Sequence, residues 1–111
     1  MNYREKFFNL FTMCAKSGSL AKGFDVSKES VTGGKAACVM VTSDVSPKTL
    51  KETAFMCEKG SVPLVELPFT MEDIGNSIGR KAGVMAVCDA GFARKLKEYA
   101  EHASEGNNVE K

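Results

Sequence analysis

The most informative feature of the hydrophobic pattern is a short unbroken apolar run at residues 36–41. A strand with one solvent-exposed face would alternate apolar and polar residues, so an unbroken run favours a strand covered on both faces. A buried helical segment would show the same pattern over so few residues. However, glycines precede the run, and Ser46 and Pro47 follow it as an N-cap and a first helical residue. The pattern therefore predicts a central strand that leads through a turn into a helix.

Apolar residues at helical spacing predict helices on both sides of this strand, and shorter apolar runs predict further strands. Helices are expected over 2–16, 24–32, 47–59, 71–79 and 90–103, and strands over 20–21, 62–67 and 84–88. This alternation predicts an α/β fold, specifically a three-layer α/β/α sandwich on a small mixed sheet. We expect a single domain over 1–103, followed by a polar, disordered tail over 104–111.

Two of these helices have informative faces. The helix at 47–59 is expected to turn Leu50, Ala54 and Cys57 toward the sheet, because these residues recur at helical spacing. The helix at 24–32 has only a thin apolar face. It therefore either lies at the periphery or uses its outer face for another purpose.

The ends of the last two helices carry capping signals and glycines. Thr70 and Asp73 resemble a capping box, and Asp89 is placed to cap the final helix. The short helix also contains Gly75 and Gly79, and interior glycines cost a helix about 1 kcal/mol each relative to alanine. The glycine pair indicates a close backbone approach, either to the sheet or to a ligand.

Composition and charge narrow the class of protein. The chain has 111 residues, of which 43% are hydrophobic and 26% charged, as in an ordinary globular protein. Its apolar runs are much shorter than the roughly 20 residues that cross a bilayer, and the N-terminus lacks a signal-peptide pattern. We therefore expect a cytoplasmic protein with no membrane partner. The net charge is +1, but residues 98–111 contribute −3 and the rest +4, which permits RNA binding without requiring it.

The four cysteines predict no metal or redox site. Cys14, Cys38, Cys57 and Cys88 form no CxxC pair, and each lies in an apolar run or helical face. This placement predicts buried, reduced thiols rather than disulfides. His102 is the only histidine, so we expect no metal site, and the fingerprints of nucleotide cofactors are missing.

The hypothesis that the protein is an enzyme depends on two carboxylates. Asp44 and Asp89 each follow a predicted strand, where α/β enzymes often place catalytic residues, and paired carboxylates can perform acid/base chemistry. Alternatively, each stabilises the turn into the following helix. The second reading is favoured, and we expect a protein without enzymatic activity.

Four segments, taken in order, resemble the motifs of one family. Residues 34–47 contain a Gly-Lys-Ala strand and an Asp-x-x-Pro turn, and residues 57–63 a Cys-Glu pair before Val-Pro. Residues 74–79 read Ile-Gly-x-x-Ile-Gly, and residues 89–96 read Asp-x-Gly-Phe-Ala-x-x-Leu. Their order and spacing are similar to the ribosomal protein L7Ae/L30e/S12e/Gadd45 superfamily, and most similar to its bacterial YlxQ-like branch.

The resemblance implies a ribosomal L30e-like sandwich and a non-catalytic function, the binding of kink-turn or similarly bent RNA. The family builds its site at the start of the second helix, with a Gly-x-Asn-Glu-x-x-Lys signature and an apolar loop. Amides and lysines there hold phosphates, while polar side chains read exposed bases. Carried over to this chain, the implied RNA-contacting residues are Lys22, Gly23, Asp25 and Lys28, and further candidates are Lys35, Phe69, Arg80 and Lys81.

The chain departs from that signature in three places. Asp25, Val26 and Glu29 stand where the family has asparagine, glutamate and lysine. Glu29 would repel a phosphate, and a valine on an exposed helix face suits a protein surface. The alternative hypothesis is therefore a protein-interaction module on the same fold, with RNA binding weakened or lost.

Overall fold

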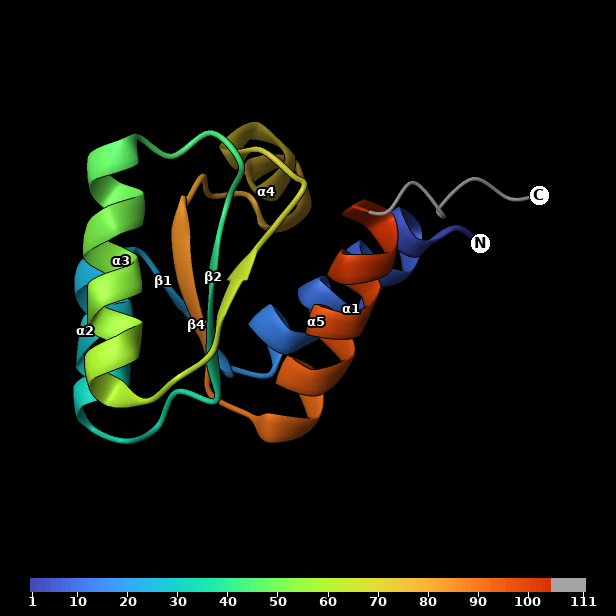
Figure 1. The fold of residues 1–111 in the computed structure, drawn as a ribbon. Helices are drawn as coiled ribbons and strands as arrows, with labels where there is room; N and C mark the ends of the chain where they lie inside the picture. Colours follow the sequence, from blue (N-terminus) through green and yellow to red (C-terminus); the bar gives the residue numbers. More distant parts are fainter. Residues whose placement is uncertain (105–111) are drawn as a thin grey trace.

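A computed structural model describes residues 1–104 and contains a four-stranded sheet between two layers of helices (Figure 1). The elements are α1 (Tyr3–Lys16), β1 (Leu20–Lys22), α2 (Phe24–Thr32), β2 (Cys38–Val41), α3 (Pro47–Gly60), β3 (Leu64–Glu66), α4 (Met71–Ile78), β4 (Val84–Val87) and α5 (Ala90–Ser104). Each predicted helix and strand is present, with ends that differ by up to two residues. The C-terminal residues 105–111, where a disordered tail was predicted, lie outside the described residues.

The sheet is mixed and has β2 and β4 at its centre. The strand order is β1-β4-β2-β3, with β2 parallel to β3 and β4 antiparallel to both of its neighbours. Every residue of β2 and β4 is buried. This burial explains why both strands read as unbroken apolar runs, and it confirms the predicted central strand.

Helices cover both faces of the sheet, as predicted for a three-layer sandwich. In Figure 1, α1 and α5 pack on one face, α2 and α3 on the other, and α4 lies near one end. Alternate side chains of β2 enter different cores: Met40 packs with α1 and α5, whereas Val39 and Val41 pack with α2 and α3. Among the described residues, no helix is both long and apolar enough to cross a membrane.

The capping signals in the sequence correctly locate three helix starts. The Ser46 hydroxyl accepts a hydrogen bond from the Thr49 N–H at 3.1 Å, and Thr70 forms the expected capping box with Asp73. Asp89 Oδ1 accepts one from the Phe92 N–H at 2.9 Å, at the start of α5.

Of the two glycines predicted inside the short helix, Gly75 is there and Gly79 is not. Gly79 lies outside the helix, because α4 ends at Ile78 and Gly79 terminates it with φ of 78°. Gly75 is inside α4, where a Cβ would lie 2.8 Å from Lys81 Cγ. Its close approach is therefore to the following loop rather than to the sheet.

The predicted inner face of α3 is partly wrong. Ala54 is exposed, and the buried residues are Thr53, Met56 and Cys57. A threonine can face the core here because its hydroxyl donates to the Thr49 carbonyl oxygen at 2.7 Å, so its polar group is satisfied within the helix. A pattern counted only from apolar residues passes over this position.

The burial of the cysteines largely follows the prediction. Cys14, Cys38 and Cys57 are buried, whereas Cys88 is partly exposed. Burial raises the pKa of the Cys14 thiol to about 11 and that of the Cys38 thiol to about 12, because a buried thiolate would lose its hydration. These two thiols are therefore protonated and inert at neutral pH.

Candidate functional site

The start of α2 and the loop between α4 and β4 meet at one end of the sheet. Gly23 precedes α2 with φ of 109° and ψ of 159°, a backbone conformation that only glycine adopts readily. Its N–H donates to the Val84 carbonyl oxygen at 2.8 Å. The pairing of β1 with β4 thus extends by one residue, from Lys22 to Gly23, and reaches Val84, the first residue of β4. The helix α2 therefore begins beside the loop 79–83.

Three cationic residues lie at this end of the molecule, one before the start of α2 and two in the neighbouring loop. Lys22 ends β1 and is partly buried, while Arg80 and Lys81 are exposed in the adjacent loop. Gly23 has no side chain, so it provides no side-chain acceptor for the first N–H groups of α2. Asp25 adds one exposed carboxylate in the first turn.

We call these residues (Lys22, Gly23, Asp25, Arg80 and Lys81) the α2 N-terminal surface. The N–H groups without a side-chain cap, the positive end of the helix dipole and the cations all favour a bound anion such as a phosphate. A Cβ built at Gly23 would have no atom within 4 Å, so the backbone there is open to a ligand.

Three other candidate residues do not belong to this surface. Lys28 is exposed further along α2, where it faces α3 across a groove. Lys35 follows the C-terminal end of α2, and nine residues of helix, about 14 Å, separate it from Gly23. Phe69 is only 3% exposed.

The burial of Phe69 contradicts the predicted apolar loop that would cover RNA bases. Its ring centroid lies 4.8 Å from those of both Phe7 and Phe8, so the side chain belongs to the core between α1 and the sheet. The Arg4 guanidinium lies 5.3 Å from the Phe69 ring centroid and pairs with Asp73 at 3.0 Å, which ties α1 to α4 over this ring. In this arrangement Phe69 offers no face to a ligand.

The carboxylates considered for acid/base chemistry lie at opposite ends of the sheet. Asp44 follows β2 and Asp89 follows β4, and these two strands are antiparallel. Asp44 Oδ1 accepts a hydrogen bond from the Met71 N–H at 3.1 Å, near the start of α4, while Asp89 caps α5. The catalytic pairing of these residues is therefore wrong, and both stabilise helix starts.

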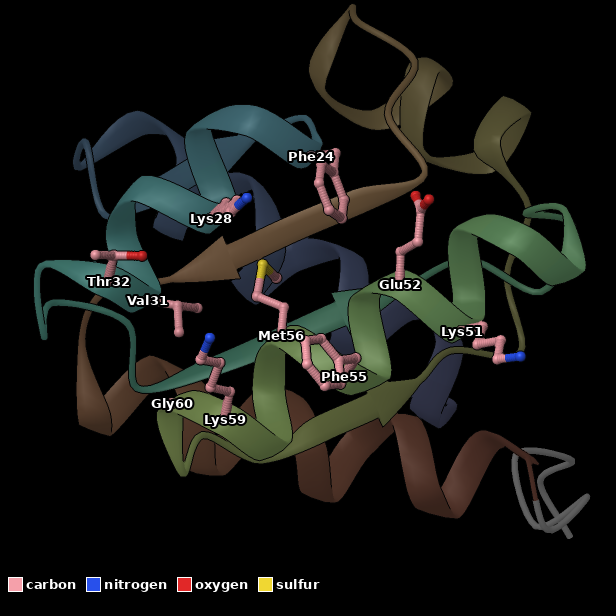
Figure 2. Close-up of a pocket in the computed structure, with 10 residues that line it drawn as sticks. All are labelled: Phe24, Lys28, Val31, Thr32, Lys51, Glu52, Phe55, Met56, Lys59 and Gly60. Atoms are coloured by element: carbon pink, nitrogen blue, oxygen red, sulfur yellow. The ribbon is translucent and has the colours of Figure 1, made fainter.

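A groove of about 890 Å³ lies between α2 and α3, where the sequence pattern predicted no site (Figure 2). The floor and α2 wall include Phe24, Val31 and Met56, and the α3 wall includes Phe55, which is 65% exposed. The hydrophobic pattern of the sequence could have indicated this groove, because Phe55 is a large aromatic residue on the otherwise polar outer side of α3.

The sequence of the chain was compared with those of known families. Residues 5–97 match the model of the ribosomal protein L7Ae/L30e/S12e/Gadd45 family. The chain belongs to this family. The match spans every element from α1 to most of α5, and it confirms the resemblance on which the candidate residues rest.

Individual relatives of the family agree with the YlxQ-like assignment. The chain is 33% identical over 98 residues to the RNA-binding protein YlxQ of Enterococcus faecium, covering 88% of this chain and 94% of the relative. It is 30% identical over 92 residues to the RNA-binding protein YlxQ of Bacillus subtilis, covering 82% and 91%. A solved structure of a Bacillus halodurans protein of unknown function superposes with a TM-score of 0.79 at 27% identity, covering 86% of this chain and 97% of the other.

Proposed function

We propose that this protein binds structured RNA, bent or bulged as in a kink-turn, through the α2 N-terminal surface and without catalysis. The observation that carries the proposal is the set of cations beside the uncapped start of α2, in a chain whose similar relatives are named RNA-binding proteins. We propose the cytoplasm as the location of the protein.

Each part of this surface has a role in the proposed complex. The N–H groups at the start of α2 hold a phosphate that approaches over Gly23, and Lys22 and Arg80 neutralise neighbouring phosphates. The Asp25 carboxylate accepts a hydrogen bond from an exposed base amino group. The RNA is selected by its shape, because a bend brings phosphates and an unpaired base to the same end of the protein.

Glu29 sets the strength of this interaction. It is exposed on α2 one turn beyond Asp25, at the position where the family signature has lysine. A carboxylate there repels phosphate, so Glu29→Lys should strengthen RNA binding. The matched control is Glu98→Lys, the same charge change at an exposed position on α5, across the sheet.

The proposal is tested by charge reversal at three positions. We expect Lys22→Glu and Arg80→Glu to weaken binding of a kink-turn RNA by about tenfold or more at moderate salt. Lys35→Glu changes the net charge by the same amount at the other end of α2, and it should change affinity less than threefold. Equal losses for all three variants would show that the attraction depends on overall charge, and would contradict a defined surface.

A further inference from the structure

The groove between α2 and α3 has two facing walls of similar composition. On α2, Phe24, Lys28 and Thr32 recur every four residues, and all three line the groove. On α3, Lys51 and Phe55 line the groove from successive turns, although Figure 2 shows the Lys51 side chain extending away from α2. Each wall therefore presents one phenylalanine with lysine beside it.

The apolar depth of the groove is built into the fold. Val31 and Met56 are 8% exposed and form its floor. The helices converge at the C-terminal end of α3, where a Cβ on Gly60 would overlap Val31 Cγ1, so only a residue without a side chain fits there. This contact closes the groove at the C-terminal end of α3.

The rim is cationic and carries an exposed aromatic ring. Lys28, Lys51 and Lys59 stand around the groove against the single acid Glu52. Lys59 Nζ lies 5.9 Å from the centroid of the Phe55 ring, which is 65% exposed. An exposed aromatic ring beside cations is the composition of an interface centre, where aromatic side chains contribute most to affinity.

We propose that this groove binds an acidic amphipathic helix of a partner protein, which lays its apolar face between α2 and α3. The nine residues from Lys51 to Lys59 span about 12 Å, or two turns of a bound helix. The apolar side chains of that helix cover Phe24, Met56 and Phe55, and its acidic residues pair with the lysines of the rim. The groove adjoins the α2 N-terminal surface at Phe24, but none of the residues that define that surface lines the groove.

A helix fits these features better than RNA or a small molecule. RNA places charged phosphates along its whole length, and the floor of the groove consists of apolar side chains that a phosphate backbone would leave uncovered. A small-molecule site buries most of its ligand. Here Phe55 leaves one wall open to solvent, so an elongated partner covers it more completely.

The probe is a phage-displayed library of 16-residue helical peptides, selected against the full wild-type chain alone. We expect enriched peptides with apolar residues at i, i+3 or i+4, and i+7, and with net negative charge. Their synthetic versions should bind Phe55→Ala at least tenfold more weakly. Lys51→Glu and Lys59→Glu should each weaken binding as well, whereas Lys95→Glu on α5 should leave it unchanged.

Three results would overturn the proposal: no enriched peptide, enriched peptides that bind wild type and Phe55→Ala equally, or enriched peptides that are neutral or basic. Kink-turn RNA is titrated against the same variants. A loss of RNA affinity in Phe55→Ala would assign the groove to RNA instead. Unchanged RNA affinity with lost peptide binding separates this inference from the proposed RNA function.

Discussion

Replacing Phe69 with alanine distinguishes a core residue from a ligand-binding one. The side chain is 3% exposed and packs on Phe7 and Phe8. Truncating a buried phenylalanine costs about 3–5 kcal/mol, and the two ring contacts favour the upper half of that range. With a urea m-value of about 2 kcal/mol/M, the unfolding midpoint should fall by roughly 2 M.

The assay is urea unfolding followed by circular dichroism, with Phe55→Ala as the matched control. Phe55 is 65% exposed, so its replacement should change the free energy of unfolding by less than about 0.5 kcal/mol. A loss below about 1 kcal/mol in Phe69→Ala would refute the assignment of this ring to the core.

The conservative variant Phe69→Leu extends the test to RNA. It keeps most of the buried volume, so the chain stays folded at a cost below about 1.5 kcal/mol. If Phe69 stacked on a base, this change would remove about 1–3 kcal/mol of binding free energy. We expect RNA affinity within twofold of wild type, and a tenfold loss would return Phe69 to the binding surface.

Three further predictions follow from the same structure. A thiol reagent at neutral pH should modify Cys88 first, because it alone of the four cysteines is partly exposed, and Cys88→Ser should abolish the fast phase. A hydrogen bond from the Thr70 N–H, reinforced by Arg4, lowers the pKa of Asp73 below its usual value. This contribution to stability is therefore present above the unfolded-state pKa of Asp73 and is lost as pH falls below it. In urea unfolding, lowering the pH from 5 to 3 should reduce the free energy of unfolding of wild type by about 0.5–1 kcal/mol more than that of Asp73→Asn. Equal losses in the two proteins would contradict this. Gly23→Ala should cost about 1–3 kcal/mol in thermal unfolding, because alanine is strained at φ of 109°, and a neutral result would contradict that backbone conformation.

The fold was largely predictable because its signals are local. Unbroken apolar runs mark strands buried on both faces, and the caps at Ser46, Thr70 and Asp89 mark helix starts. The inner face of α3 was predicted less well, since Thr53 satisfies its hydroxyl within the helix and so can be buried. The sequence pattern also does not show the direction of each strand. Asp44 and Asp89 each follow a strand, but the antiparallel pairing of β2 with β4 places them at opposite ends of the sheet.

The candidate site was predictable only where it follows from chain order. Lys22, Gly23 and Asp25 are consecutive or nearly so, and any fold that starts a helix there keeps them together. Phe69 was misjudged because an apolar residue in a loop looks the same in sequence whether it is buried or exposed. The groove depends on how two helices diverge from the Gly60 contact, which sequence periodicity does not encode.

A fluorescence-anisotropy titration would show whether the start of α2 recognises bent RNA. The three ligands are a kink-turn RNA, the same RNA with its bulge removed, and a plain duplex, each at two salt concentrations. We expect tighter binding of the kink-turn RNA at both salt concentrations, with affinity falling as salt rises. Equal, weak binding of all three RNAs would contradict this expectation and would leave the fold without the RNA recognition proposed for it.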